Sequence, residues 1–206
     1  MRKPKLFHVS ETAGIVRFEP RPPPSPDAGV TGDAVWAVAE SHLVNFLTPR
    51  DCPRITFRVG PDTTESDKAR LLAGAERVVA FERAWLDRVR GCRLYVYEMP
   101  GETFVEALPG AGYWVSREPV TPLRVEVRTN LLRALAEAGA EVRILQDFWP
   151  LRDAVVASSL QFSVIRYPNA KPRASEARQA HEQSADPEGA GPEGQTKQGD
   201  KRQAGE

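Results

Sequence analysis

The sequence predicts an α+β domain with mixed, mostly antiparallel sheets and a few flanking helices. Strand-like segments outnumber helical ones between residues 5 and 165, and the two kinds do not alternate regularly, as they would in a doubly wound fold. A chain of 206 residues, 41% of them hydrophobic, is long enough to bury one core. Residues 168–206 contain no Leu, Ile, Val, Met, Phe, Tyr or Trp. We therefore expect a single globular domain over residues 1–167 and a disordered tail over 168–206.

The first half of the domain predicts four strands, a loop and a short helix. Apolar residues alternate with polar ones or run together in the strands expected at residues 5–10, 34–38, 53–59 and 77–81. Residues 18–29 carry the run Arg-Pro-Pro-Pro-Ser, which predicts a stiff surface connector, with an SH3-type ligand as the alternative. Ser41 is the expected N-cap of a short helix that Thr48-Pro49 ends.

The second half predicts more strands and three further helices. A helix over residues 82–90 is expected to end at Gly91. Strands are expected at residues 93–98, 101–108, 113–116, 120–127 and 141–145, and the first of these is predicted to be central because apolar residues and tyrosines alternate along it. Thr129 or Asn130 is expected to cap a helix that ends at Gly139, and the last helical segment, residues 148–160, is entered through Trp149-Pro150.

Charge and short motifs exclude several classes of function. Lys plus Arg and Asp plus Glu number 28 each, so no net positive charge is available to attract nucleic acid or an anionic membrane. The apolar run that follows the basic start is too short for a signal peptide or a membrane span, and the two cysteines form no paired motif. We expect a cytoplasmic protein. Zinc, serine-hydrolase and P-loop motifs are absent, so we expect no metal. The GxGxxG match at residues 189–194 lacks a preceding strand and is rejected.

Several side chains are candidate site residues, and each has a structural alternative. His8 stands on an apolar strand, where a hydrogen-bonded structural histidine is the other interpretation, and Trp36 has a core role as its alternative. Three arginines, Arg50, Arg54 and Arg58, flank Cys52 and predict an anion-binding edge, or else solvated residues paired with nearby acids. Cys52 is a candidate nucleophile with His42 as its base, and an inert buried thiol is the alternative interpretation.

Together, several motifs resemble an uncharacterised bacterial family, a domain of unknown function. They are His-Val-Ser-Glu at residues 8–11, the proline-rich run, Val-Trp-Ala-Val at 35–38, Pro-Arg-Asp-Cys-Pro-Arg at 49–54 and Tyr-Trp-Val-Ser-Arg-Glu at 113–118. The resemblance covers roughly residues 5–165 and implies no activity. More distantly, a first-strand histidine and a later strand running into Val-x-Pro are similar to the ADP-ribosyltransferase fold, which implies NAD as the ligand.

That second resemblance implies roles for particular residues. His8, with Ser10 beside it, would hydrogen-bond the adenosine ribose of NAD, and Trp36 would form the aromatic wall for nicotinamide. Anchoring on Val120-Thr-Pro places Tyr113 where such transferases carry their glutamate, and an uncharged phenol cannot do that electrostatic work. Glu118 is the alternative catalytic residue, with Glu106 as a further candidate. Independently of this resemblance, Arg54 in the arginine edge is a candidate for binding a phosphate.

The sequence thus leaves three functional hypotheses. The first is a nucleotide-binding, ADP-ribosyltransferase-like protein that uses NAD, with Glu118 as its electrostatic group. The second is a non-catalytic interaction or nucleotide-sensing module with a degenerate active site. The third is a structural protein whose cleft is filled because Trp36 and Trp114 pack together. A carboxylate in the same cleft as His8 would favour the first hypothesis, and Tyr113 alone there would favour the second.

Overall fold

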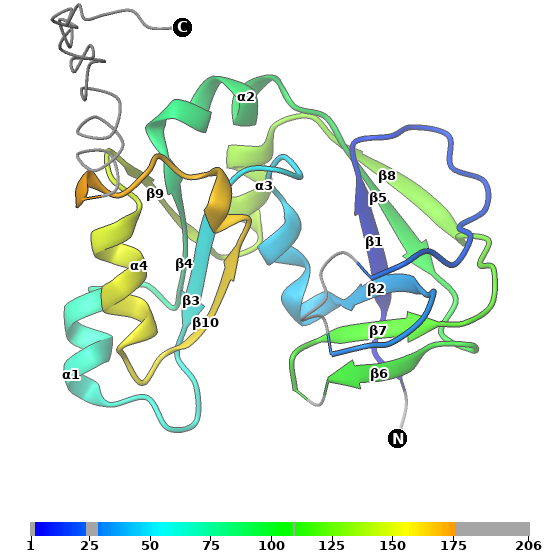
Figure 1. The fold of residues 1–206 in the computed structure, drawn as a ribbon, viewed down its shortest axis with the longest axis horizontal. Helices are drawn as coiled ribbons and strands as arrows, with labels where there is room; N and C mark the ends of the chain where they lie inside the picture. Colours follow the sequence, from blue (N-terminus) through cyan, green and yellow to red (C-terminus); the bar gives the residue numbers. More distant parts are fainter. Residues whose placement is uncertain (1–2, 24–28, 109, 176–206) are drawn as a thin grey trace, which may run out of the picture. The chain divides into compact units, whose positions relative to one another are not determined.

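The computed structural model describes residues 3–23, 29–108 and 110–175. The chain divides into two units, Met1–Lys171 and Pro172–Glu206, and everything below concerns the first. It contains two sheets (Figure 1). None of the described helices is long and apolar enough to cross a membrane. The predicted disorder of residues 176–206 and the middle of the proline-rich loop, residues 24–28, lie outside the described residues.

The larger sheet has six strands in the order β6-β7-β2-β1-β5-β8, and every neighbouring pair is antiparallel. Its strands are β1 (Leu6–Ser10), β2 (Val35–Ala39), β5 (Leu94–Met99), β6 (Val105–Leu108), β7 (Tyr113–Ser116) and β8 (Arg124–Arg128). Since β1 and β5 lie inside this sheet, the residues predicted to form a central strand at 93–98 do so.

The smaller sheet has four strands in the order β10-β3-β4-β9, and β4 and β9 form its parallel pair. Its strands are β3 (Arg54–Arg58), β4 (Arg77–Glu82), β9 (Glu141–Leu145) and β10 (Gln161–Ile165). The described helices are short: 3-10 helices η1 (Glu40–Phe46), η3 (Arg83–Trp85) and η4 (Tyr167–Asn169), α-helices α1 (Glu65–Asp67), α2 (Leu86–Gly91), α3 (Leu131–Glu137) and α4 (Trp149–Val156), and a π-helical turn η2 (Lys68–Leu72). The predicted α+β class with mostly antiparallel pairing is confirmed.

Buried apolar side chains form several clusters that fix the two sheets. One cluster packs β3 and β4 against α4 and η2, with Phe57, Leu72 and Phe148 fully buried. A second joins the sheets to each other, because Phe7 and Val38 of the larger sheet share it with Val79 of the smaller one and with α3. A third covers the other face of the larger sheet, where residues 15–18 and Val120 close over it.

Several predicted element boundaries are corrected by the structure. The helix expected over 148–160 ends at Val156, and residues 161–165 form an edge strand that the sequence interpretation lacked. Ser41 caps nothing, since the N-cap of η1 is Ala39. Asn130 does cap α3, because its Oδ1 accepts the backbone N–H of Arg133 at 3.0 Å. The strand expected from Val120 begins at Arg124, and Val120 instead pairs with Phe18 in an isolated bridge.

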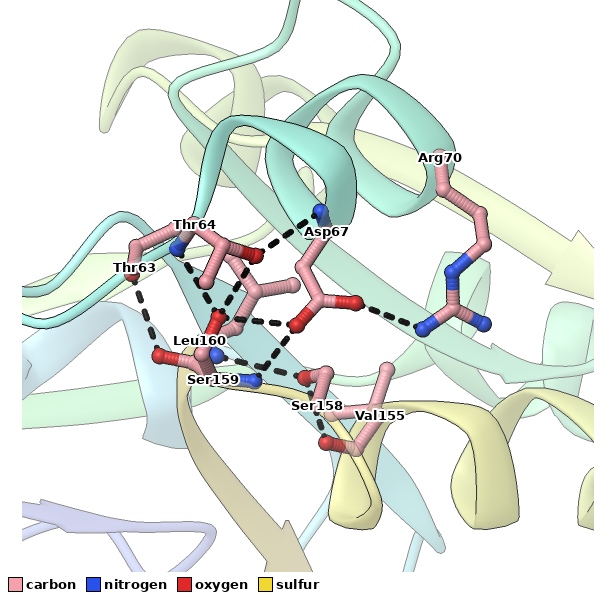
Figure 2. Close-up of polar contacts among 8 residues, drawn as sticks. All are labelled: Thr63, Thr64, Asp67, Arg70, Val155, Ser158, Ser159 and Leu160. Carbon is pink, nitrogen blue, oxygen red and sulfur yellow. Dashed lines mark hydrogen bonds and ion pairs between the residues drawn. The ribbon is translucent and has the colours of Figure 1, made fainter.

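The start of β10 is held by a polar network around Asp67 (Figure 2). One carboxylate oxygen of Asp67 accepts both the N–H and the hydroxyl of Ser159 at 2.8 Å, and the other accepts Arg70 at 2.7 Å. These bonds hold the pKa of Asp67 well below its usual range, first through Arg70 and then through Ser159. The segment before β10 is thereby tied to α1, the short helix that follows β3.

Packing and hydrogen bonds of the first unit continue to Lys171. Ala170 is buried in the cluster under α4, and the Lys171 carbonyl accepts the indole N–H of Trp149 at 2.7 Å. The Lys171 N–H donates to the buried carboxylate of Glu82. Local composition did not indicate these contacts, because they are made by backbone groups and one alanine.

Candidate functional site

The register of the larger sheet decides which candidate side chains share a face. His8 on β1 is paired with Tyr97 on β5, and Ala37 on β2 is paired with Trp114 on β7. Side chains alternate between the two faces of a strand, and directly paired residues point to the same face. The cluster that contains Tyr97, Ala37 and Trp114 therefore marks the face that carries His8. We call this the histidine face.

The imidazole of His8 has one fixed hydrogen bond. Its Nδ1 lies 2.7 Å from the backbone carbonyl oxygen of Trp36. A carbonyl oxygen only accepts, so Nδ1 carries the proton. The ring also packs against Phe18, with 4.6 Å between ring centroids. Burial lowers the pKa of His8 below 6.5, so the ring is neutral at pH 7 and its Nε2 is an acceptor. Among the described residues Nε2 has no partner.

Two arginines place positive charge near His8. The backbone of Arg21 pairs with Ala34, the residue just before β2, and the backbone N–H of Arg50 donates to Glu11 at 2.8 Å. After burial, which has the largest effect, Arg50 and Arg21 also lower the pKa of His8. Both side chains are exposed. In the described part of the chain neither guanidinium has a hydrogen-bond or ion-pair partner, so both are available to an anion.

The three remaining candidates, Ser10, Glu118 and Glu106, form no hydrogen bond with His8 in the described part of the chain. The Ser10 hydroxyl accepts the backbone N–H of Thr12 at 3.0 Å and so holds the turn after β1. Glu118 follows β7, and its side chain is exposed. Its backbone N–H donates to Ser116, but its carboxylate has no hydrogen bond or ion pair with any described residue. Glu106 accepts the backbone N–H of Gly110 at 2.9 Å and supports a turn.

Trp36 and Tyr113 project from the opposite face of the same sheet. Trp36 is paired with Val115, and Tyr113 with Val38, in the row that faces the smaller sheet. Their rings meet edge to face with centroids 6.2 Å apart, and the indole N–H of Trp36 is buried without a partner. The predicted cleft therefore does not gather the side chains of His8, Trp36 and Tyr113, because adjacent strand positions alternate between faces. Trp36 and Trp114 also lie on opposite faces, so they do not fill a common cleft.

Arg54 lies inside the fold, where it has structural contacts. It is 3% exposed, and its guanidinium donates to the carbonyls of Asn45 at 2.8 Å and Cys52 at 3.0 Å. It also donates to the Arg50 carbonyl at 3.3 Å and lies over the Phe46 ring. Burial lowers the pKa of Arg54 to about 10, so it stays charged at pH 7. Arg54 thus holds the loop that carries Arg50.

The cysteine alternative has no support in the geometry. Cys52 is fully buried, and burial raises the pKa of its thiol to about 12. The Nδ1 of His42 forms a hydrogen bond with the Ser41 hydroxyl at 2.9 Å, and no described hydrogen bond joins His42 to Cys52. Cys92 is also buried, and both thiols are free. Within the described ranges no group of three or more His, Cys, Asp or Glu side chains is arranged to hold a metal ion.

The sequence analysis did not identify Arg21 as a positive charge near His8. The signal was present in the proline-rich run, but a run that predicts a stiff connector does not show which strand the connector crosses. Arg50 was predicted for an anion-binding edge with Arg54 and Arg58. The structure separates these three residues: Arg50 is exposed near His8, Arg54 is buried, and Arg58 is half-buried on β3 of the smaller sheet.

Comparison with known proteins gives one match. A protein family described as a family of unknown function, DUF6886, matches residues 7–170. No curated protein and no solved structure matches the chain.

Proposed function

Because the chain belongs to the DUF6886 family, whose function is unknown, we propose its function from geometry: it binds a nucleotide on the histidine face, with NAD as the first candidate. One observation carries the proposal. His8 is held in a single neutral tautomer with Nε2 unpaired, beside two exposed arginines that have no partner in the described chain. A ribose offers hydroxyl donors to Nε2, and a diphosphate offers anionic oxygens to Arg21 and Arg50.

The geometry favours binding over group transfer. An oxocarbenium-like transition state needs a carboxylate placed against the reacting sugar. The Glu118 carboxylate forms no hydrogen bond with His8, and Tyr113 lies on the other face of the sheet. The proposal is therefore a nucleotide-sensing module. A transferase reaction with NAD, in which Glu118 would act, is the candidate extension of this function. An assay for nicotinamide release tests whether that reaction occurs.

The test is calorimetric titration of the protein with NAD. We expect His8→Ala to weaken binding about ten-fold or more, because one hydrogen bond to a ribose hydroxyl is lost. His181→Ala is the matched control, since His181 lies outside residues 7–170, which the family model matches. Arg21→Gln and Arg50→Gln are each expected to weaken binding and to reduce its dependence on salt.

Two outcomes would decide against the proposal. If NAD, ADP-ribose and ADP all fail to bind the folded protein, the histidine face is not a nucleotide site. If they bind equally well to His8→Ala, a nucleotide is bound elsewhere. Release of nicotinamide that is lost in Glu118→Gln would extend the proposal to a transferase.

A further inference from the structure

A polar hollow, separate from the histidine face, lies between the two sheets. It has a volume of about 160 Å³, and its walls come from η1, from the turn between β6 and β7, and from β3, β4 and β10. It adjoins a wider hollow of about 470 Å³, with which it shares Arg58 and Arg77. Tyr113 lines the smaller hollow, so this site and the histidine face lie on opposite sides of the larger sheet. We call the smaller one the inter-sheet hollow.

Strand register places its polar groups in two adjacent rows. Thr56 on β3 is paired with Ser163 on β10, and two residues further along β3 Arg58 is paired with Arg77 on β4. Residues two apart on a strand share a face, so these four side chains project the same way. Val79, which is paired with Thr56, belongs to the cluster between the sheets. These four side chains therefore project from the smaller sheet toward the larger one.

A buried hydroxyl in the inter-sheet hollow has no hydrogen-bond partner among the residues that the structure describes. Thr56 is 4% exposed, and its Oγ1 makes no hydrogen bond. Buried hydroxyls nearly always have partners, so an orphaned one that lines a hollow indicates a bound polar group. The neighbouring Ser163 hydroxyl lies within hydrogen-bonding reach of the Tyr113 phenol, whose pKa is raised by burial.

Arg58 and Arg77 give the inter-sheet hollow a positive charge, and among the described residues the Glu76 carboxylate lines only the wider hollow beside them. Arg58 and Arg77 stand directly opposite each other on antiparallel strands, where like charges destabilise a sheet. Arg58 has no hydrogen-bond or ion-pair partner among the described residues, and Arg77 has one long bond of 3.4 Å to the Ser41 carbonyl. No carboxylate lines the inter-sheet hollow. An anion between the two guanidinium groups would remove the repulsion and pair both of them.

We propose that the inter-sheet hollow binds the phosphate group of a small phosphorylated molecule, with Arg58 and Arg77 holding its oxygens and the Thr56 hydroxyl donating to it. Arginine forks match tetrahedral phosphate oxygens, and a hydroxyl supplies a neutral donor at the bottom of the site. The hollow accommodates the phosphate, and the wider hollow beyond it gives room for the rest of the molecule. This site does not depend on the nucleotide proposal, since the two share no residue.

The experiment measures binding of inorganic phosphate and of ribose 5-phosphate by calorimetry and by thermal shift. We expect Arg58→Gln and Arg77→Gln each to weaken binding at least about ten-fold, as is usual when a charged hydrogen-bond partner is removed. The matched control is Arg93→Gln, because Arg93 is exposed and its guanidinium also lacks a partner in the described ranges. The His8→Ala variant is expected to bind both probes normally, which separates this site from the histidine face.

Thr56→Val provides the sharper readout. It preserves side-chain shape and removes only the orphaned hydroxyl, so the free protein should be as stable as before or more stable. Phosphate binding should nevertheless weaken several-fold. A purely structural threonine would not give this combination.

Each remaining outcome supports or overturns the proposal. Tighter binding of ribose 5-phosphate than of inorganic phosphate supports a phosphorylated metabolite, and the reverse supports free phosphate as the ligand. Failure of both probes to bind overturns the site. So does stabilisation that sodium chloride reproduces at the same ionic strength, because that is charge screening.

Discussion

The histidine face and the inter-sheet hollow use the same kinds of side chain in different ways. Each contains a histidine whose pKa is lowered by burial and two arginines that lack carboxylate partners. On the histidine face, Arg21 and Arg50 come from segments outside the strands. In the inter-sheet hollow, Arg58 and Arg77 are paired across two strands. One pair of charges is therefore free to adapt, whereas the other is held in place before any ligand arrives.

This difference has a thermodynamic consequence. Side chains on loops lose rotamer freedom when they bind, while side chains on paired strands have lost part of that freedom already. The inter-sheet hollow also carries repulsion in its empty state, which a ligand relieves. We therefore expect the hollow to discriminate by shape and charge, and the histidine face to tolerate several nucleotides.

The largest expected effect concerns Arg54, which lies on the same face of β3 as Arg58 but has the opposite role. Arg54→Met removes donors from three loop carbonyls and should lower the free energy of unfolding by about 3 kcal/mol. Arg58→Met should change it by no more than about 0.5 kcal/mol. Urea denaturation of the two variants measures the difference. Equal destabilisation would mean that Arg58 is structural and would weaken the comparison.

The next effect tests how closely the hollow is packed. Gly110 and Gly112 both have φ of +74°, so alanine at either should cost about 1–2 kcal/mol. A Cβ at Gly110 would meet nothing within 4 Å, whereas one at Gly112 would overlap the His42 ring. Gly112→Ala should therefore be the more destabilising in thermal unfolding.

A second substitution controls for the ring. In a His42→Ala background the two glycine variants should lose similar stability, because the overlap is gone. If Gly112→Ala remains worse by the same margin, its extra cost has another origin and the histidine does not form that wall of the hollow.

The smallest expected effect is the response to pH. His8 has a pKa below 6.5 in the folded protein, so as pH falls through 6.5 the unfolded chain takes up the proton first. Stability should therefore decline modestly between about pH 6.5 and pH 5, and be flat above pH 7. Melting temperatures of the wild type and His8→Gln across this range measure it. A variant that declines as steeply as the wild type would assign the slope to other groups.

Local patterns predicted the strands well, but not the way the faces combine. The alternation of residues 53–59 and 93–98 identified β3 and β5, because a half-buried strand needs that period. The same period places His8 and Trp36 on opposite faces, and this depends on the register between β1 and β2, which no local pattern contains. β10 was missed because the apolar residues of α4 appeared to continue to Leu160.

The inter-sheet hollow was out of reach for a related reason. Thr56 and Arg58 are two residues apart and visibly share a face of a predicted strand. Their partners Arg77 and Ser163 arrive from distant parts of the chain, and only pairing brings them together. The orphaned hydroxyl of Thr56 is a property of packing, so a sequence cannot show it.

The order in which the smaller sheet is assembled has a consequence for synthesis on the ribosome. β3 and β4 emerge early and pair with each other. Their outer neighbours come from much later in the chain: β9 pairs with β4, and β10 pairs with β3, where Gln161 lies opposite Arg58. Until then the nascent strand pair has two open edges, and the apolar face that carries Phe57 is not yet covered by α4. A chain that stalls before β10 should therefore bind chaperones or aggregate. The hydrogen bonds between Asp67 and Ser159, which hold the start of β10, form only after this last strand has been made.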